Sequence, residues 1–189
     1  FNNQLDKVKI VLKYYSEYVN AQDLDLDTGL MRASSIGHIE IINLLINAGA
    51  DVNARNDETS TALIETSYIH NNLEVIRLLI NAGANVNAQD YDGNTPVIIA
   101  SKMGNIELLD LLINAGADPN IQNNYSDTAL TNAIIINNTE MVKLLLKSGA
   151  DPNIKNEVYN FTNSFIGSLG PDLEKDRVGF KDLSLGNLL

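Results

Sequence analysis

The sequence repeats itself with a period of 33 or 34 residues, and this repetition restricts the fold more than any other feature. Leu-Leu-Ile-Asn-Ala-Gly-Ala occurs three times and returns as Leu-Leu-Leu-Lys-Ser-Gly-Ala; the four copies begin at residues 44, 78, 111 and 144. A Thr-led apolar run precedes each copy and begins at Thr28, Thr61, Thr95 and Thr128. Such a period is typical of repeat proteins, in which each unit buries its apolar face against its neighbours. We therefore divide the central part of the chain into four units: 23–55, 56–89, 90–122 and 123–155.

Each unit is expected to form two short helices and an extended turn. The leading Thr can accept a hydrogen bond from an unpaired backbone N–H, which favours a helix start. Apolar residues recur at helical spacing in the second helix, as at Ile106, Leu109 and Ile113. A glycine then ends this helix, because the left-handed conformation needed there strains glycine least; these glycines are Gly49, Gly83, Gly116 and Gly149.

The units resemble the ankyrin repeat. The resemblance rests on Asp-Tyr-Asp-Gly-Asn at 90–94, Thr-Pro-Val-Ile-Ile-Ala at 95–100 and Leu-Leu-Ile-Asn-Ala-Gly-Ala-Asp-Pro-Asn at 111–120. It covers residues 23–155, which are 133 of the 189 residues. The fold class that it implies is an all-α ankyrin-repeat solenoid of stacked helix-turn-helix units with extended β-turn tips.

The turns depart from the pattern of this family. Gly93 supplies the turn glycine of the third unit, whereas the other units carry Leu26, Thr59 and Ser126 there. We expect these replacements to weaken the hydrogen bonds between turns in the first, second and fourth units.

The two flanks are predicted to cap the stack, because the ends of a stack must expose a polar face. Residues 1–22 are expected to form an N-terminal capping helix, the second helix of a truncated repeat, with an amphipathic helix over 4–18. Residues 156–189 have one more repeat length and are interpreted as a degenerate C-terminal capping repeat.

Charge and residue types exclude several classes of function. The chain carries 24 acidic and 13 basic residues, a formal charge of −11, so nucleic acid and anionic membranes are poor partners and a basic protein surface is favoured. It has no cysteine and two histidines, and neither histidine has a further ligand at metal spacing. The acidic run at 23–27 lacks the glycine and the downstream glutamate of a calcium loop. We therefore predict no enzyme activity, no cofactor and no metal site.

The resemblance implies a concave binding face made of the turn tips and the exposed sides of the first helices. Tyrosine is enriched at binding hot spots, since it buries a large area and keeps a polar end. The predicted protein-binding residues are Tyr68, Ile69, Asp57, Glu58, Tyr91, Asp92, Asn94, Lys102, Met103, Tyr125, Asp127, Ile135 and Ile136.

The predicted function is that of a non-catalytic, monomeric module that binds another protein on its concave face. The alternative is the ankyrin portion of a larger or exported bacterial effector or adaptor, whose activity lies outside this chain. A cytoplasmic location is favoured. Because the sequence begins at Phe1 and not at a methionine, an incomplete N-terminus and an exported or periplasmic location stay as alternatives.

Overall fold

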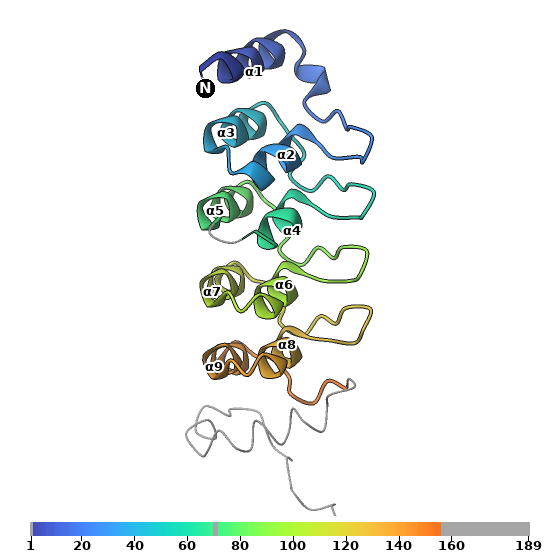
Figure 1. Cartoon of the computed structure of the whole chain (residues 1–189), viewed down its shortest axis with the longest axis vertical. Coiled ribbons are helices and arrows are strands. Elements are labelled where there is room, and N and C mark those ends of the chain that lie inside the picture. Colours follow the sequence, from blue (N-terminus) through green and yellow to red (C-terminus); the bar gives the residue numbers. More distant parts are fainter. Residues whose placement is uncertain (1, 70–71, 156–189) are drawn as a thin grey trace, which may run out of the picture.

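The computed structural model describes residues 2–69 and 72–155, which form one column of stacked helices (Figure 1). The column begins with α1 (Asn2–Tyr14) and a short 3-10 helix, η1 (Ser16–Tyr18). Four helix pairs follow: α2 (Gly29–Ile36) with α3 (Ile39–Asn47), α4 (Ala62–Ser67) with α5 (Leu73–Asn81), α6 (Pro96–Lys102) with α7 (Ile106–Asn114), and α8 (Ala129–Ile135) with α9 (Thr139–Lys147). The described residues contain no β-strand, and a single antiparallel bridge joins Gln22 to Thr28. The fold class is therefore the all-α stack that the sequence predicts.

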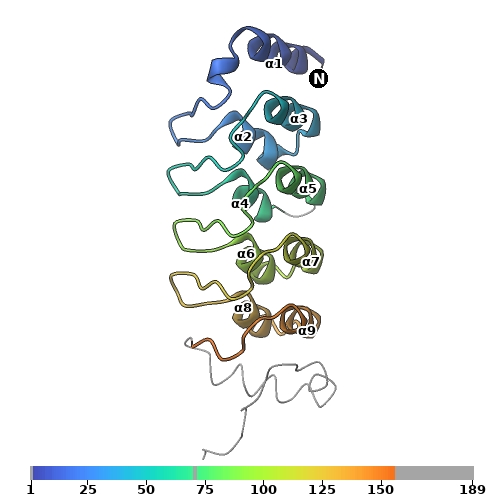
Figure 2. The same ribbon diagram turned by 180° about the vertical axis from the view of Figure 1, so that it is seen from behind.

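The first and second helices of the pairs form two parallel columns. Helices α2, α4, α6 and α8 lie in one column, α3, α5, α7 and α9 lie in the other, and α1 extends the second column at its N-terminal end (Figure 1). The turns project from the side of the first helices, away from the second helices (Figure 2). The proposed degenerate repeat at 156–189 lies outside the described residues.

Local chemistry starts and stops these helices as the sequence predicts. The side-chain oxygens of Thr28, Thr61, Thr95 and Thr128 each accept the backbone N–H three residues ahead at 3.3 Å. This bond pairs a donor that has no partner inside the helix. The glycines after the second helices have φ between 88° and 91°, a conformation that strains other residues. The predicted threonine caps and glycine stops are therefore confirmed.

One continuous hydrophobic core runs along the column, from Leu30 to Ala150. Both helices of each pair contribute to it, and the second helices bury Ile42, Ile76, Leu109 and Val142 almost completely. Since each helix pair has only two helices, much of this apolar surface is covered by the pairs above and below. Stability therefore depends on neighbouring units as well as on each unit itself.

An asparagine at the end of each unit bonds the unit that follows. The Oδ1 atoms of Asn20, Asn53, Asn87 and Asn120 accept the backbone N–H of Asp51, Asn85, Asp118 and Asp151 at 2.7–2.8 Å. The bond within the turn is made by the residue two positions earlier, as from Asn53 N–H to Asp51 Oδ1 at 2.9 Å. Asn20 follows the same pattern, which places α1 and η1 in register with the repeats.

A second set of bonds crosses every junction on the turn side. The side chains of Gln22, Arg55, Gln89 and Gln122 donate to the backbone carbonyls of Arg55, Gln89, Gln122 and Lys155 at 3.0–3.1 Å. Each donor stands one repeat before its acceptor. The two sets together fix how each unit is placed on the next.

The expectation that missing glycines weaken the bonds between turns is wrong. Leu26, Thr59 and Ser126 adopt φ of 60°, 57° and 62°, so they take the conformation for which Gly93 is suited. The backbone bonds between successive tips are kept: Asp57 N–H to Asp25 O at 3.2 Å, and Tyr91 N–H to Glu58 O and Asn124 N–H to Asp92 O at 2.9 Å. The replacements therefore cost backbone strain and leave the hydrogen bonds in place.

Replacing a strained residue by glycine should stabilise the stack. A left-handed conformation costs an L-residue about 1–2 kcal/mol, and the greater freedom of glycine in the unfolded chain offsets about half of this gain. We expect Thr59→Gly and Ser126→Gly each to raise the free energy of unfolding by about 0.5–1 kcal/mol. Denaturant unfolding of the full chain measures this difference.

The opposite substitution, Gly93→Ala, is the control. A Cβ atom at Gly93 would lie 2.8 Å from Asn124 Oδ1 and 2.9 Å from the Asn124 backbone nitrogen. Strain and this clash should together cost about 2 kcal/mol. Equal stability of all three variants would show that the turns carry no strain.

Candidate protein-binding face

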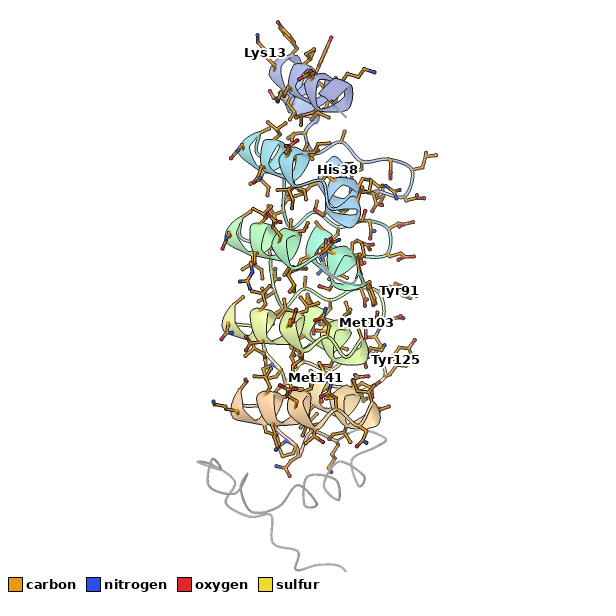
Figure 3. The ribbon with its side chains drawn as sticks, turned by 60° about the vertical axis from the view of Figure 1, so that its left-hand side comes forward. Lys13, His38, Tyr91, Met103, Tyr125 and Met141 are labelled. Carbon is orange, nitrogen blue, oxygen red and sulfur yellow. The ribbon has the colours of Figure 1, made fainter. Side chains whose placement is uncertain are left out.

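The turn tips and the C-terminal ends of the first helices share one side of the column, which we call the concave face. Figure 3 shows Tyr91, Met103 and Tyr125 on this side. Tyr91 is 76% exposed and Tyr125 61% exposed, and Tyr68, Met103, Ile135 and Ile136 are exposed as well. Of the other predicted residues, Asp57, Glu58, Asp92 and Lys102 are exposed, while Ile69 and Asp127 are half-buried.

Asn94 does not belong to the surface, and its prediction as a contact residue is wrong. Only 2% of its area is exposed, because it stands directly before the buried helix cap Thr95. Its Oδ1 accepts a bond from Asn123 Nδ2 at 2.9 Å, and its Nδ2 lies 3.3 Å from Asp90 Oδ2. Asn94 therefore joins the third and fourth units from inside.

Tyr68 links two units through its hydroxyl. It stands at the end of α4 and donates to Asp90 Oδ2 in the next turn at 3.0 Å. Burial raises the pKa of the Tyr68 hydroxyl, and the bond to Asp90 raises it further. Tyr68 is therefore part of the junction between the second and third units as well as an exposed surface residue.

Tyr125 makes a similar link one unit later. Its hydroxyl donates to Asp92 Oδ1 on the preceding tip at 3.3 Å. The hydroxyl of Tyr91 makes no hydrogen bond within the described ranges. Tyr91 is thus the most exposed of the three tyrosines and the least engaged by the stack.

Arg32 bridges the acidic run of the first turn. Its guanidinium lies 2.9 Å from Asp23, 3.1 Å from Asp25 and 3.1 Å from Asp27. Its hydrogen bond lowers the pKa of Asp23, and the pKa of Arg32 is raised in turn. The first tip is therefore partly neutralised, and the free acidic edge of the concave face begins at Asp57.

Sequence reasoning missed Asp90 and Asn123, which organise two of the turns. The Oδ1 of Asp90 accepts Asn94 N–H at 2.8 Å, and that of Asn123 accepts Asp127 N–H at 2.9 Å. Asp or Asn is favoured at the first position of a tight turn for this reason. That preference was a usable signal, but it gave no hint of the bond from Tyr68.

Two further properties concern binding of ions and membranes. Within residues 2–69 and 72–155, no three side chains of His, Asp or Glu are grouped so as to hold a metal ion. No helix in the described part of the chain is long and apolar enough to cross a membrane.

A column of paired helices with turns on one side defines the class of helical repeat solenoids. The family model for ankyrin repeats (3 copies) matches residues 1–90, 30–123 and 67–156, and this chain belongs to the ankyrin repeat family. Among solved structures, an ankyrin repeat domain from Acinetobacter baumannii AYE is similar, with a TM-score of 0.79 and 30% sequence identity over 93% of this chain and 91% of that chain. No curated protein matches the sequence. Ankyrin repeats are generally protein–protein interaction modules and typically have no catalytic activity.

Removing the Tyr68 hydroxyl should weaken the stack. Tyr68→Phe deletes the bond to Asp90, and a hydrogen bond to a charged but partly exposed group contributes about 1 kcal/mol. Denaturant unfolding should show this loss. Tyr91→Phe removes an exposed hydroxyl without a hydrogen bond and should leave stability unchanged, which makes it the matched control.

The same variant has a defined pH dependence. A raised folded-state pKa means that the contribution of Tyr68 is complete below its ordinary pKa of 10.0 and is lost as pH rises through the higher folded-state value. The stability difference between wild type and Tyr68→Phe should therefore shrink above pH 10. A difference that stays constant to high pH would contradict the proposed link.

Proposed function

We propose that this chain is a non-catalytic module that binds another protein on its concave face, and that the partner offers basic side chains around one or two apolar anchors. The observation that carries the proposal is the combination of exposed aromatic and aliphatic side chains with acidic residues on one side of the column. Exposed apolar patches bordered by polar residues are typical of interaction sites.

The apolar part of this face lies over the third and fourth units. Met103 directly follows α6; Ile135 ends α8 and Ile136 directly follows it, one repeat further along the column. In the residue order of the repeats, Met103 and Ile136 stand at the same position. Tyr91 and Tyr125 also share this region, so an apolar side chain of a partner can bury itself between neighbouring units.

The acidic part of this face determines which charge a partner should carry. Asp57, Glu58 and Asp92 are exposed at successive tips, and the whole chain is at −11. Such a field favours encounter with a basic surface and suppresses acidic partners. Since Arg32 partly neutralises the first tip, basic groups of the partner are directed to the second and third tips.

A selection from a random peptide library on the immobilised full chain tests the proposal. Enriched peptides should contain Lys or Arg next to aliphatic or aromatic residues. Tyr91→Ala should weaken their binding by about 2 kcal/mol, roughly 30-fold in Kd, because exposed hot-spot tyrosines bury much of their area on binding. Tyr14→Ala removes a comparably exposed tyrosine outside the concave face and should have no effect.

Salt separates the charged part of this binding from the apolar part. Asp92→Asn should weaken binding less than Tyr91→Ala does, and its effect should diminish at high ionic strength because salt screens exposed charges. Enrichment of acidic peptides, or equal losses with Tyr14→Ala and Tyr91→Ala, would refute the proposed face.

A further inference from the structure

The outer face of the N-terminal cap differs from the same face of every other second helix. In α1, this face carries Lys7, Ile10 and Tyr14. In the four repeats the same three positions are polar. They hold Glu40, Asn43 and Asn47 in the first unit; Glu74, Arg77 and Asn81 in the second; Glu107, Asp110 and Asn114 in the third; and Glu140, Lys143 and Lys147 in the fourth. Four units thus keep this face polar with a glutamate at its start, and the cap replaces it with a lysine and two large apolar residues.

These apolar residues are not the ones that hold the cap on the stack. Helix α1 packs on α3, and its half-buried residues are Leu5, Val8 and Leu12. By contrast, Ile10 is 57%, Val11 49%, Tyr14 64% and Tyr18 63% exposed. Exposed apolar residues that the stack does not need indicate an interaction surface.

The side of α1 that corresponds to the buried side of α3 is polar. Lys9 and Lys13 are exposed and stand one repeat before Ile42 and Ile46, which belong to or pack on the core. The exposed apolar residues of α1 therefore lie away from this polar side, on the outer side of the second-helix column.

Charge distinguishes the cap from the rest of the chain. Residues 1–22 hold three lysines against Asp6 and Glu17, a net charge of +1, while the remaining residues hold 10 basic and 22 acidic residues, a net charge of −12. Two copies of the chain therefore repel each other over most of their surface and least at their caps.

We propose that the outer face of the cap, formed by Lys7, Ile10, Val11 and Tyr14, binds the same face of a second copy. The interface is isologous, with a twofold axis between the two α1 helices. Antiparallel pairing centred on Ile10 and Val11 places Lys7 of one copy opposite Tyr14 of the other. The Tyr14 ring already accepts a cation within its own chain, since Lys13 Nζ lies 5.2 Å from its centroid.

Such a dimer keeps the acidic bodies apart and leaves both concave faces open. One helix per copy provides less than the roughly 1,200 Å² of a stable interface, so the dimer is weak and its Kd is on the order of 100 µM. It differs from the monomer that the sequence analysis predicts and does not rest on the proposed function.

Sedimentation velocity of the full chain over a concentration series around that Kd tests the dimer. Wild type should shift from the mass of one chain to that of two. Ile10→Asn with Tyr14→Asn installs the residues of the first repeat at the same positions and should raise Kd at least about tenfold. Lys7→Glu introduces the glutamate that all four repeats carry at this position and should also weaken the dimer.

The matched control removes an isoleucine and a tyrosine of similar exposure from the concave face. Ile36→Asn with Tyr91→Asn should leave Kd unchanged, and thermal unfolding of both double variants shows that each still folds. Wild type that stays a single chain throughout the series overturns the proposal. So does a dimer that the cap variants leave intact or that the concave-face control weakens equally.

Discussion

The whole structure depends on one constraint: a single helix pair cannot cover its own apolar surface or pair all of its turn backbone. The units supply each other with both. Asn53 accepts the N–H of Asn85 in the next unit at 2.7 Å, and Arg55 donates to the carbonyl of Gln89 at 3.1 Å. The asparagine bond recurs at every described junction at 2.7–2.8 Å, so these bonds allow little variation in how units stack. Precise stacking in turn places residues 33 positions apart on one continuous face.

The sequence predicted the features that are decided within one unit. Helix starts at Thr28 or Thr95 and the stop at Gly83 follow from local backbone chemistry, which the residues themselves reveal. The burial of Asn94 and the bonds from Tyr68 to Asp90 and from Tyr125 to Asp92 depend on a different unit. Predicting them requires knowing which side chain stands at the corresponding position of the neighbouring unit. The units differ at these positions: Ser60 in the second unit stands where the third has Asn94. That the tyrosines share one side of the stack could therefore be predicted, whereas the bonds that they make between units could not, and binding on that side stays a proposal.

The absence of a turn glycine could affect both the backbone strain of the turn and the hydrogen bonds between turns, and the sequence alone does not separate these two effects. Absence of glycine suggested weaker bonds between turns, yet Thr59 and Ser126 keep the left-handed backbone and all three bonds between tips form. The strained residues also make bonds within their own turns: Leu26, Thr59 and Ser126 N–H donate to the carbonyls of Asp23, Asn56 and Asn123 at 3.0–3.1 Å. Surrounding structure of this kind can hold a strained conformation. At Gly93 a larger residue could not take the same conformation without a clash, because Asn124 lies too near for a side chain.

Stacking and binding meet at the carboxylates of the tips. Asp92 accepts a hydrogen bond from the Tyr125 hydroxyl of the following unit, so the same carboxylate serves the stack and belongs to the proposed binding face. A basic group that binds Asp92 competes with this hydroxyl, and the 3.3 Å bond is long enough to be exchanged at small cost. The freed Tyr125 can then turn its ring toward the partner. Asp90 behaves differently, because the Tyr68 hydroxyl, Asn94 N–H and Asn94 Nδ2 all donate to it. Its carboxylate therefore keeps its partners within the stack. The proposed face thus consists of a fixed inner row of bonds and an outer row that a partner can exchange.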